Sequence, residues 1–138
     1  MKTLVIVCML LFPMTAFADS FWCTQTVLKA GMPTIGFCFA DSSTCTSKSK
    51  QLRKEAVSVG KCKPTKLSAC FLTITESTQS VQSTCFDSYS TCNGWAEASA
   101  DNADVGVRVS QCTIWSIFDY YIAKAKINAI IGSKGSVQ

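Results

Sequence analysis

The sequence predicts an α+β fold, a small disulfide-rich protein made of two tandem ββα(β) repeat units plus a C-terminal strand and helix extension. Three observations predict it: a repeated segment, eight cysteines shared evenly between its copies, and strand-type runs that precede a helix start in each copy. Each unit is shorter than fifty residues. A core of that size stabilises a fold poorly, so disulfides are expected.

The repeat is carried by residues 38–45, which read CFADSSTC, and by residues 85–92, which read CFDSYSTC. Five of the eight positions are identical at an offset of 47, and a three-residue insertion precedes the last cysteine of the second copy. The eight cysteines of the two copies are Cys23, Cys38, Cys45 and Cys62, then Cys70, Cys85, Cys92 and Cys112.

The first eighteen residues have the pattern of a Sec-type signal peptide. Lys2 supplies the positive charge, residues 4–12 the apolar segment, and residues 16–18 (AFA) the small-x-small site, so cleavage is expected after Ala18. Removing Cys8 with the signal leaves an even number of cysteines, which favours oxidised pairs. We therefore expect a secreted protein, or a periplasmic or cell-surface one.

The chain divides into four expected parts, each named by its residues. These are the signal peptide 1–18, the first four-cysteine unit with its linker 19–66, the second unit 67–112, and the aromatic C-terminal extension and tail 113–138. Aromatic, β-branched and Thr-rich runs predict a strand pair in each unit. The expected strands are 21–28 and 34–39 in the first unit, and 69–75 and 81–86 in the second.

A helix start follows each strand pair, because Asp41 and Ser88 are favourable N-cap residues. The expected buried stripes are Cys45, Leu52 and Ala56 in the first helix, and Cys92, Trp95, Ala96, Ala100 and Ala103 in the second. Residues 105–109 alternate as a half-buried strand does. Residues 63–66 are expected to link the units, and residues 121–131 to form a terminal helix.

Two disulfide pairings per unit remain open. Cys23 can pair with Cys38 and Cys45 with Cys62, or Cys23 with Cys62 and Cys38 with Cys45, and the second unit repeats the choice. Only the first pairing follows from a cross-strand register, since a turn near residues 30–31 places Cys23 opposite Cys38.

Catalytic equipment is missing from the sequence. The chain has no histidine, which excludes serine triads, His-assisted cysteine nucleophiles and HExxH metalloproteases. The closest cysteines are seven apart, unlike the C-x₂₋₄-C pairs of structural zinc sites and the C-x-x-C of redox enzymes. No phosphate-binding or dinucleotide motif is present. We therefore expect no enzyme activity, no metal and no cofactor.

Charge is distributed unevenly between the two units. Residues 45–66 are basic, and the candidate contacts for an anionic partner are Lys48, Lys50, Arg53 and Lys54. The equivalent part of the second unit is acidic, with Glu97, Asp101 and Asp104. The alternative interpretation of the basic run is the solvated face of a helix. The net charge of +4 is too small to indicate a nucleic-acid partner.

The C-terminal extension contains an aromatic group that is expected to pack as the core of a terminal element. Its members are Trp115, Phe118, Tyr120 and Tyr121. The alternative is an anchor for a partner or for a membrane interface.

The duplicated C-x₁₄-C-x₆-C arrangement, with Cys-Phe before the helix, resembles small exported repeat proteins of bacteria. The first functional hypothesis is an exported, non-enzymatic binding or structural module of the bacterial cell envelope or surface, acting through protein partners or self-association. The alternative is a secreted effector, toxin-like protein or inhibitor that acts on an anionic membrane surface or a foreign protein.

Overall fold

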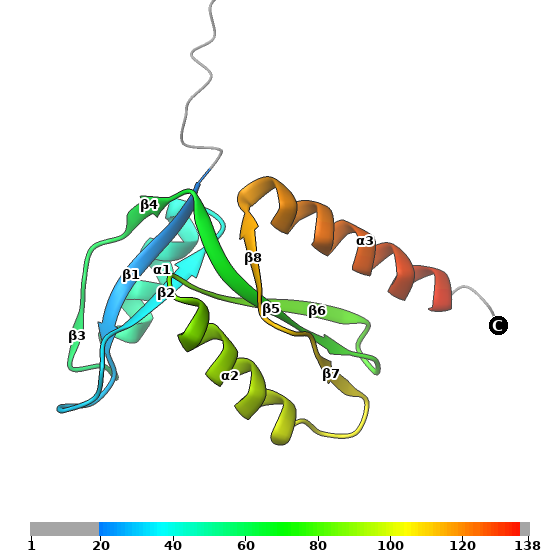
Figure 1. The fold of residues 1–138 in the computed structure, drawn as a ribbon, viewed down its shortest axis with the longest axis horizontal. Helices are drawn as coiled ribbons and strands as arrows, with labels where there is room; N and C mark the ends of the chain where they lie inside the picture. The colour runs from blue at the N-terminus through cyan, green and yellow to red at the C-terminus, as the bar shows by residue number, and fades with distance from the viewer. Residues whose placement is uncertain (1–19, 136–138) are drawn as a thin grey trace, which may run out of the picture.

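The computed structural model describes residues 20–135, and side chains as far as residue 132. The expected signal peptide 1–18 lies outside the described residues. Within them the protein is α+β, an antiparallel eight-stranded sheet with three helices and four disulfides. Figure 1 shows α1 beside the β1–β2 hairpin, with α2 and α3 on opposite sides of the β5–β6 hairpin.

The elements follow one another in the same order in both halves of the chain. The first half contains β1 (Phe21–Val27), β2 (Ile35–Phe39), α1 (Ser42–Leu52), β3 (Ser58–Val59) and β4 (Lys63–Thr65). The second contains β5 (Leu67–Thr75), β6 (Ser80–Phe86), α2 (Tyr89–Asp101), β7 (Val107–Val109) and β8 (Thr113–Ser116), and α3 (Ile117–Gly135) ends the described chain. This order is compatible with a duplicated unit.

The two hairpins join edge to edge through their second strands. The main path of the sheet is β3-β1-β2-β6-β5-β7, while β4 also pairs with β1 and β8 with β5. At the join, Cys38 lies opposite Cys85, so equivalent positions of the two halves face each other across antiparallel strands. The repeat is compatible with either a two-fold rotation or a translation between the halves, and this antiparallel pairing fits the rotation.

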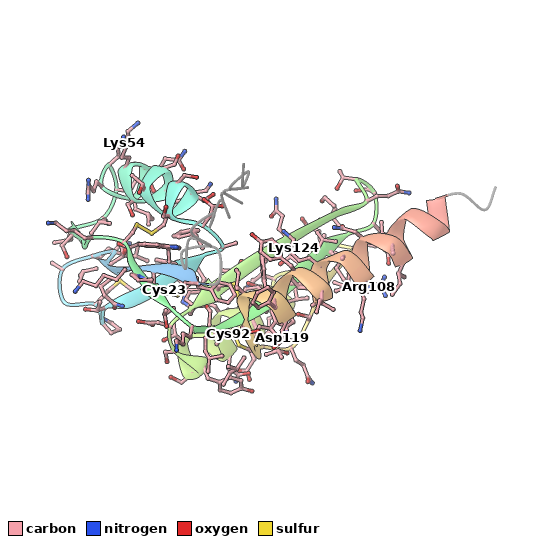
Figure 2. All side chains as sticks on the ribbon, turned by 90° about the horizontal axis from the view of Figure 1, so that it is seen from above. Cys23, Lys54, Cys92, Arg108, Asp119 and Lys124 are labelled. Carbon is pink, nitrogen blue, oxygen red and sulfur yellow. A yellow bond between two sulfur atoms is a disulfide. The ribbon has the colours of Figure 1, made fainter. Side chains whose placement is uncertain are left out.

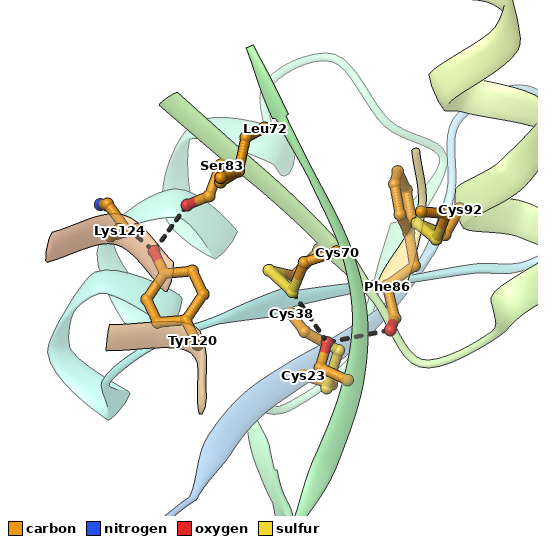
Figure 3. Close-up of a disulfide and its surroundings, with 12 residues drawn as sticks. Cys23, Cys38, Cys70, Leu72, Ser83, Phe86, Cys92, Tyr120 and Lys124 are labelled. Atoms are coloured by element: carbon orange, nitrogen blue, oxygen red, sulfur yellow. Dashed lines mark hydrogen bonds between the residues drawn. A yellow bond between two sulfur atoms is a disulfide. The ribbon is translucent and has the colours of Figure 1, made fainter. Parts of the chain in front are cut away.

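A row of four cysteines crosses the centre of the sheet. Cys23 lies opposite Cys38, Cys38 opposite Cys85, and Cys85 opposite Cys70. Directly opposed residues point to the same face of a sheet, so the Cys23–Cys38 and Cys70–Cys85 disulfides lie side by side (Figure 3). Phe21, Ile117 and Tyr120 complete this core cluster, which α3 covers.

The other face of the sheet carries α1 and α2. Its second core cluster includes Phe71, Phe86 and Ala96, and the strand members alternate with the cysteines of the row. Each helix is tied to the segment that follows it, by Cys45–Cys62 in the first half and by Cys92–Cys112 in the second. The structure therefore has the pairing that the cross-strand register favoured.

The expected linker at residues 63–66 is wrong, because Lys63–Thr65 forms β4. Lys63 pairs with Cys23, as Thr113 of β8 pairs with Cys70 in the second half. Only Lys66 separates β4 from β5. Each half is thus ββαββ. The strand β4 was not expected, whereas β8 is the strand that was expected in the C-terminal extension.

The expected buried stripes of the helices are partly wrong. α1 ends at Leu52, so Ala56 lies beyond it, and Ser49 is buried instead. In α2 only Cys92 and Ala96 are buried. Trp95 is 38% exposed, Ala100 is exposed, and Ala103 lies beyond the end of the helix and is exposed too. Each helix meets the sheet through two side chains one turn apart, and its last turns run past the contact.

α3 begins four residues before the expected start and continues to Gly135. Ile117 and Tyr120 are buried, but Phe118 and Tyr121 are 60% and 52% exposed. The expectation that the whole aromatic group forms a core was wrong, since only one side of the helix meets the sheet. Within residues 20–135, no helix is long and apolar enough to cross a membrane.

Candidate functional site

Two adjacent hollows share Phe39 and Lys48, and we call them together the Lys48 groove. The first, of about 260 Å³, lies between β2 and α1, and Phe37, Gln51, Leu52 and Glu55 complete its lining. The second, of about 390 Å³, lies between the start of α1, the end of β2, β6 and α3. It is lined by, among others, Asp41, Lys48, Ser83, Tyr120, Tyr121 and Lys124.

The position of Lys48 follows from how α1 starts and packs. Asp41 caps the helix and accepts a hydrogen bond from the Thr44 backbone N–H at 2.7 Å. Cys45 and Ser49 turn toward the sheet and are buried. Lys48, three residues after Cys45, lies at the flank of that buried side, where both hollows open.

Asp41 lies in the second hollow, but its carboxylate is already occupied by hydrogen bonds. The Thr44 backbone N–H and then the Ser43 hydroxyl hold the pKa of Asp41 below its usual value, against a smaller opposing effect of burial. The Thr44 hydroxyl donates a further bond at 2.9 Å. The Asp41 carboxylate therefore has a structural role, as the negatively charged N-cap of α1.

Tyr120 fixes the α3 side of the groove (Figure 3). Its ring is 5% exposed, and its hydroxyl shares a hydrogen bond with the Ser83 hydroxyl at 2.6 Å. Lys124, one turn further along α3, donates from Nζ to the Tyr120 hydroxyl at 3.4 Å and lies 5.3 Å from the ring centroid. A buried tyrosine thus holds an ammonium group at the rim.

Among the described side chains, no carboxylate lies within 4.0 Å of the ammonium group of either groove lysine. Across residues 20–132, the single ion pair within 4.0 Å joins Arg108 to Glu76, far along the chain from Lys48 and Lys124. An anion that enters the second hollow meets both ammonium groups, the Tyr120 hydroxyl and aromatic surface. The arrangement can bind a carboxylate that is attached to an apolar group.

In the second half of the chain, the position equivalent to Lys48 carries an aromatic side chain that packs on the sheet. The repeat offset of 47 places Trp95 of α2 at the position of Lys48 and Phe86 at that of Phe39. Trp95 packs on Phe86 with ring centroids 5.4 Å apart, and Phe86 is fully buried. Phe39 has no aromatic residue at the equivalent position of α1 and stays partly exposed, with Trp22 opposite it on β1.

Of the four cations that the sequence analysis selected, only Lys48 lines the groove. Arg53 lies beside another hollow, of about 280 Å³, together with Trp22 and Lys61. Lys50 and Lys54 are exposed and line none of the hollows described for this part of the chain. Figure 2 shows Lys54 pointing away from the sheet and from Lys124.

On the side of the groove formed by β6 and α3, the sequence pointed to Tyr120 as part of the aromatic group but gave no sign of Ser83 or Lys124. No local pattern joins these residues, because β6 and α3 meet only in the folded chain. The signal that could have found the other side was the replacement of Trp95 by Lys48 between aligned copies.

All eight cysteines of residues 20–135 are in disulfides. In the same part of the chain, no three His, Cys, Asp or Glu side chains lie close enough to hold a metal ion. Four disulfides indicate a secreted or extracellular disulfide-rich protein. Comparison with family models, with curated proteins and with solved structures finds no match to this chain.

Proposed function

We propose that this is an exported, non-enzymatic binding module that recognises an acidic segment of a partner protein through the Lys48 groove. One observation carries the proposal: Lys48 and Lys124, neither paired with a carboxylate, flank a hollow lined by aromatic side chains. Concave apolar surface with a few placed polar groups is the usual form of a binding site.

The two parts of the groove contribute differently to binding. Lys48 is exposed, so its charge attracts an acidic segment and orients it, more than it adds to affinity. The aromatic surface around Phe39 supports affinity, because it loses contact with water when the segment binds. The disulfides on both sides of β2 keep this surface preformed, which lowers the entropy cost of binding.

Fluorescence anisotropy with labelled short acidic peptides tests the proposal on the oxidised protein. We expect binding that weakens as salt is added, and a loss of about tenfold for Lys48→Glu. Lys54→Glu makes the same charge change outside the groove and is expected to retain most of the affinity. Equal binding of charge-reversed peptides, or equal losses in the two variants, would contradict the proposal.

A second candidate function is association with an anionic membrane surface. The observation that favours it is the exposed apolar side of α3, where Phe118, Tyr121, Ile122 and Ile130 are all more than half exposed. Flotation with vesicles that contain phosphatidylglycerol tests it. Association that is lost in a Phe118→Ser, Ile122→Ser variant supports this function, and absence of flotation in low salt rules it out.

A further inference from the structure

We infer that the Lys48 groove receives an aromatic side chain of the partner segment, in the place that Trp95 occupies in the second half of this chain. The inference rests on the proposed function and names the anchor of the same site. Trp95 serves as an internal example of the occupant, because it belongs to an equivalent helix on an equivalent strand pair.

The equivalence of the two helices is visible in their burial. Cys45 and Cys92 are both fully buried and both disulfide-bonded, and one turn later Ser49 and Ala96 are 3% and 5% exposed. The two helices therefore present the same side to the sheet. The position three residues after the cysteine, Lys48 or Trp95, leaves each helix in the same direction.

Trp95 shows what an aromatic ring does at that position. It packs edge-on against Phe37 with centroids 5.6 Å apart, and tilted against Phe86 at 5.4 Å. Phe37 belongs to the first half, so this single ring covers the join between β2 and β6. Aromatic pairs in such geometries are stabilising beyond the area that they bury.

The first half keeps part of this surface and lacks the ring on the helix. The counterpart of Phe37 is Thr84, and Trp22 of β1 lies opposite Phe39 where Ala69 lies opposite Phe86. Phe39, the counterpart of Phe86, is partly exposed beside a hollow of about 260 Å³. That volume is several times the roughly 30 Å³ share of one water molecule, so it accommodates a side chain. Lys48 stands where the ring would attach, and an aromatic ring that enters beside it gains a cation–π contact.

The charges of the groove determine which residues the partner can carry next to its aromatic residue. Lys48 and Lys124 both line the second hollow, and the Asp41 carboxylate there is held by the helix start. Carboxylates next to the aromatic residue of the partner would approach these ammonium groups. The occupant is therefore an aromatic residue with Asp or Glu beside it, in an exposed segment of a partner protein.

Selection from a displayed library of random dodecapeptides against the oxidised protein tests the inference. We expect the enriched peptides to share one aromatic residue with acidic neighbours, and replacing that aromatic residue by Ala to weaken binding at least about tenfold. Lys48→Trp is the matched variant, since it supplies the ring from within the chain. It should weaken binding of the enriched peptides to the same extent, whereas Lys54→Trp should not.

Each outcome separates the inference from the proposed function. Enriched acidic peptides without an aromatic residue, or full binding to Lys48→Trp, overturn the aromatic anchor and leave acidic recognition standing. If the wild-type protein enriches acidic peptides no more than Lys48→Glu does, both the aromatic anchor and the proposed function are overturned. Intact mass confirms four disulfides in each variant, and a blue-shifted tryptophan emission in Lys48→Trp but not in Lys54→Trp is the result expected if the groove accepts a ring.

Discussion

Asp41 shows how one side chain fixes the start of a helix and, with it, the position of the groove lysine. Its carboxylate accepts hydrogen bonds from the Thr44 backbone N–H and from two hydroxyl groups. These bonds stabilise the charged form, so the pKa of Asp41 is lower in the folded protein than in the unfolded chain. A lowered pKa gives stability that is present at neutral pH and is lost as the pH falls through the folded value.

Asp41→Ala is expected to lower the free energy of unfolding by about 1 kcal/mol at neutral pH. The loss should shrink as the pH falls through the lowered pKa of Asp41, because the wild-type carboxyl is then protonated as well. Asp41→Asn keeps an oxygen for the cap, so its loss at neutral pH should be smaller, and it should also shrink as the pH falls because the titrating group is the wild-type carboxyl. Denaturant unfolding across this pH range measures the three proteins, and a loss for Asp41→Ala that is constant with pH would contradict the account.

Residues that act locally were predictable from the sequence, and residues that act between the halves were not. Asp41 and Ser88 were recognised as caps because a cap and its acceptor site lie three residues apart. Gly36 gave no signal, although a Cβ there would overlap the Asp87 carboxylate. Gln25 donates to that carboxylate at 2.5 Å from another strand. Only the joined sheet brings the three residues together.

At the scale of elements, α3 depends on a small contact with the rest of the fold. Ile117 and Tyr120, in its first turn, are its buried side chains among those described, and Tyr120 also packs edge-on against Phe21 at 5.4 Å. The hydroxyl bond from Tyr120 to Ser83 connects the helix to β6. The later turns of α3 therefore have few tertiary contacts that would protect them from local unfolding.

Tyr120→Phe is expected to cost about 1 kcal/mol, because the Ser83 hydroxyl loses a partly buried partner while the ring packing remains. Amide hydrogen exchange should become faster through α3 and stay unchanged in α2. Tyr121→Phe removes the same group from an exposed ring and serves as the control. Equal exchange in the two variants would show that this bond does not hold the helix.

The types of most elements were predictable from strand and helix patterns. The short strand β4 and the first residue of α3 were not. β4 was missed because it is three residues long and contains Pro64, which suits an edge strand that needs few donors. The start of α3 carried an unused signal. Ser116 caps the helix by accepting from the Asp119 backbone N–H at 3.3 Å, and its hydroxyl donates to the Asp119 carboxylate at 3.0 Å.

For the whole molecule, the fold class and the cysteine framework followed from composition and spacing, because covalent links restrict the possible arrangements. The relation of the two halves did not follow, since it depends on which strand edges meet. Antiparallel pairing of β2 with β6 places both helices on one face and both cross-strand disulfides on the other. The open groove depends on this arrangement, because its two sides come from different halves.

The two disulfides that tie α1 and α2 to the segments after them should contribute equally to the free energy of unfolding. Replacing both Cys45 and Cys62 by Ala opens a link with a sequence separation of 17, and replacing Cys92 and Cys112 opens one of 20. The chain-entropy relation gives a loss of roughly 3 kcal/mol for either, with a difference of only about 0.1 kcal/mol. Guanidinium unfolding measures both, and losses that differ several-fold would contradict the equivalence of the halves.

The claim on which the account depends is that the first half leaves open a site that Trp95 fills in the second. The most direct test is titration of the ¹⁵N-labelled oxidised protein with the peptide acetyl-Asp-Glu-Trp-Glu-Asp-amide, followed by amide chemical shifts. The account predicts saturable shifts that concentrate in residues 37–48 and 120–124 and disappear in Lys48→Trp. Shifts centred on α2 around Trp95, or no saturable shifts in either segment, would contradict it.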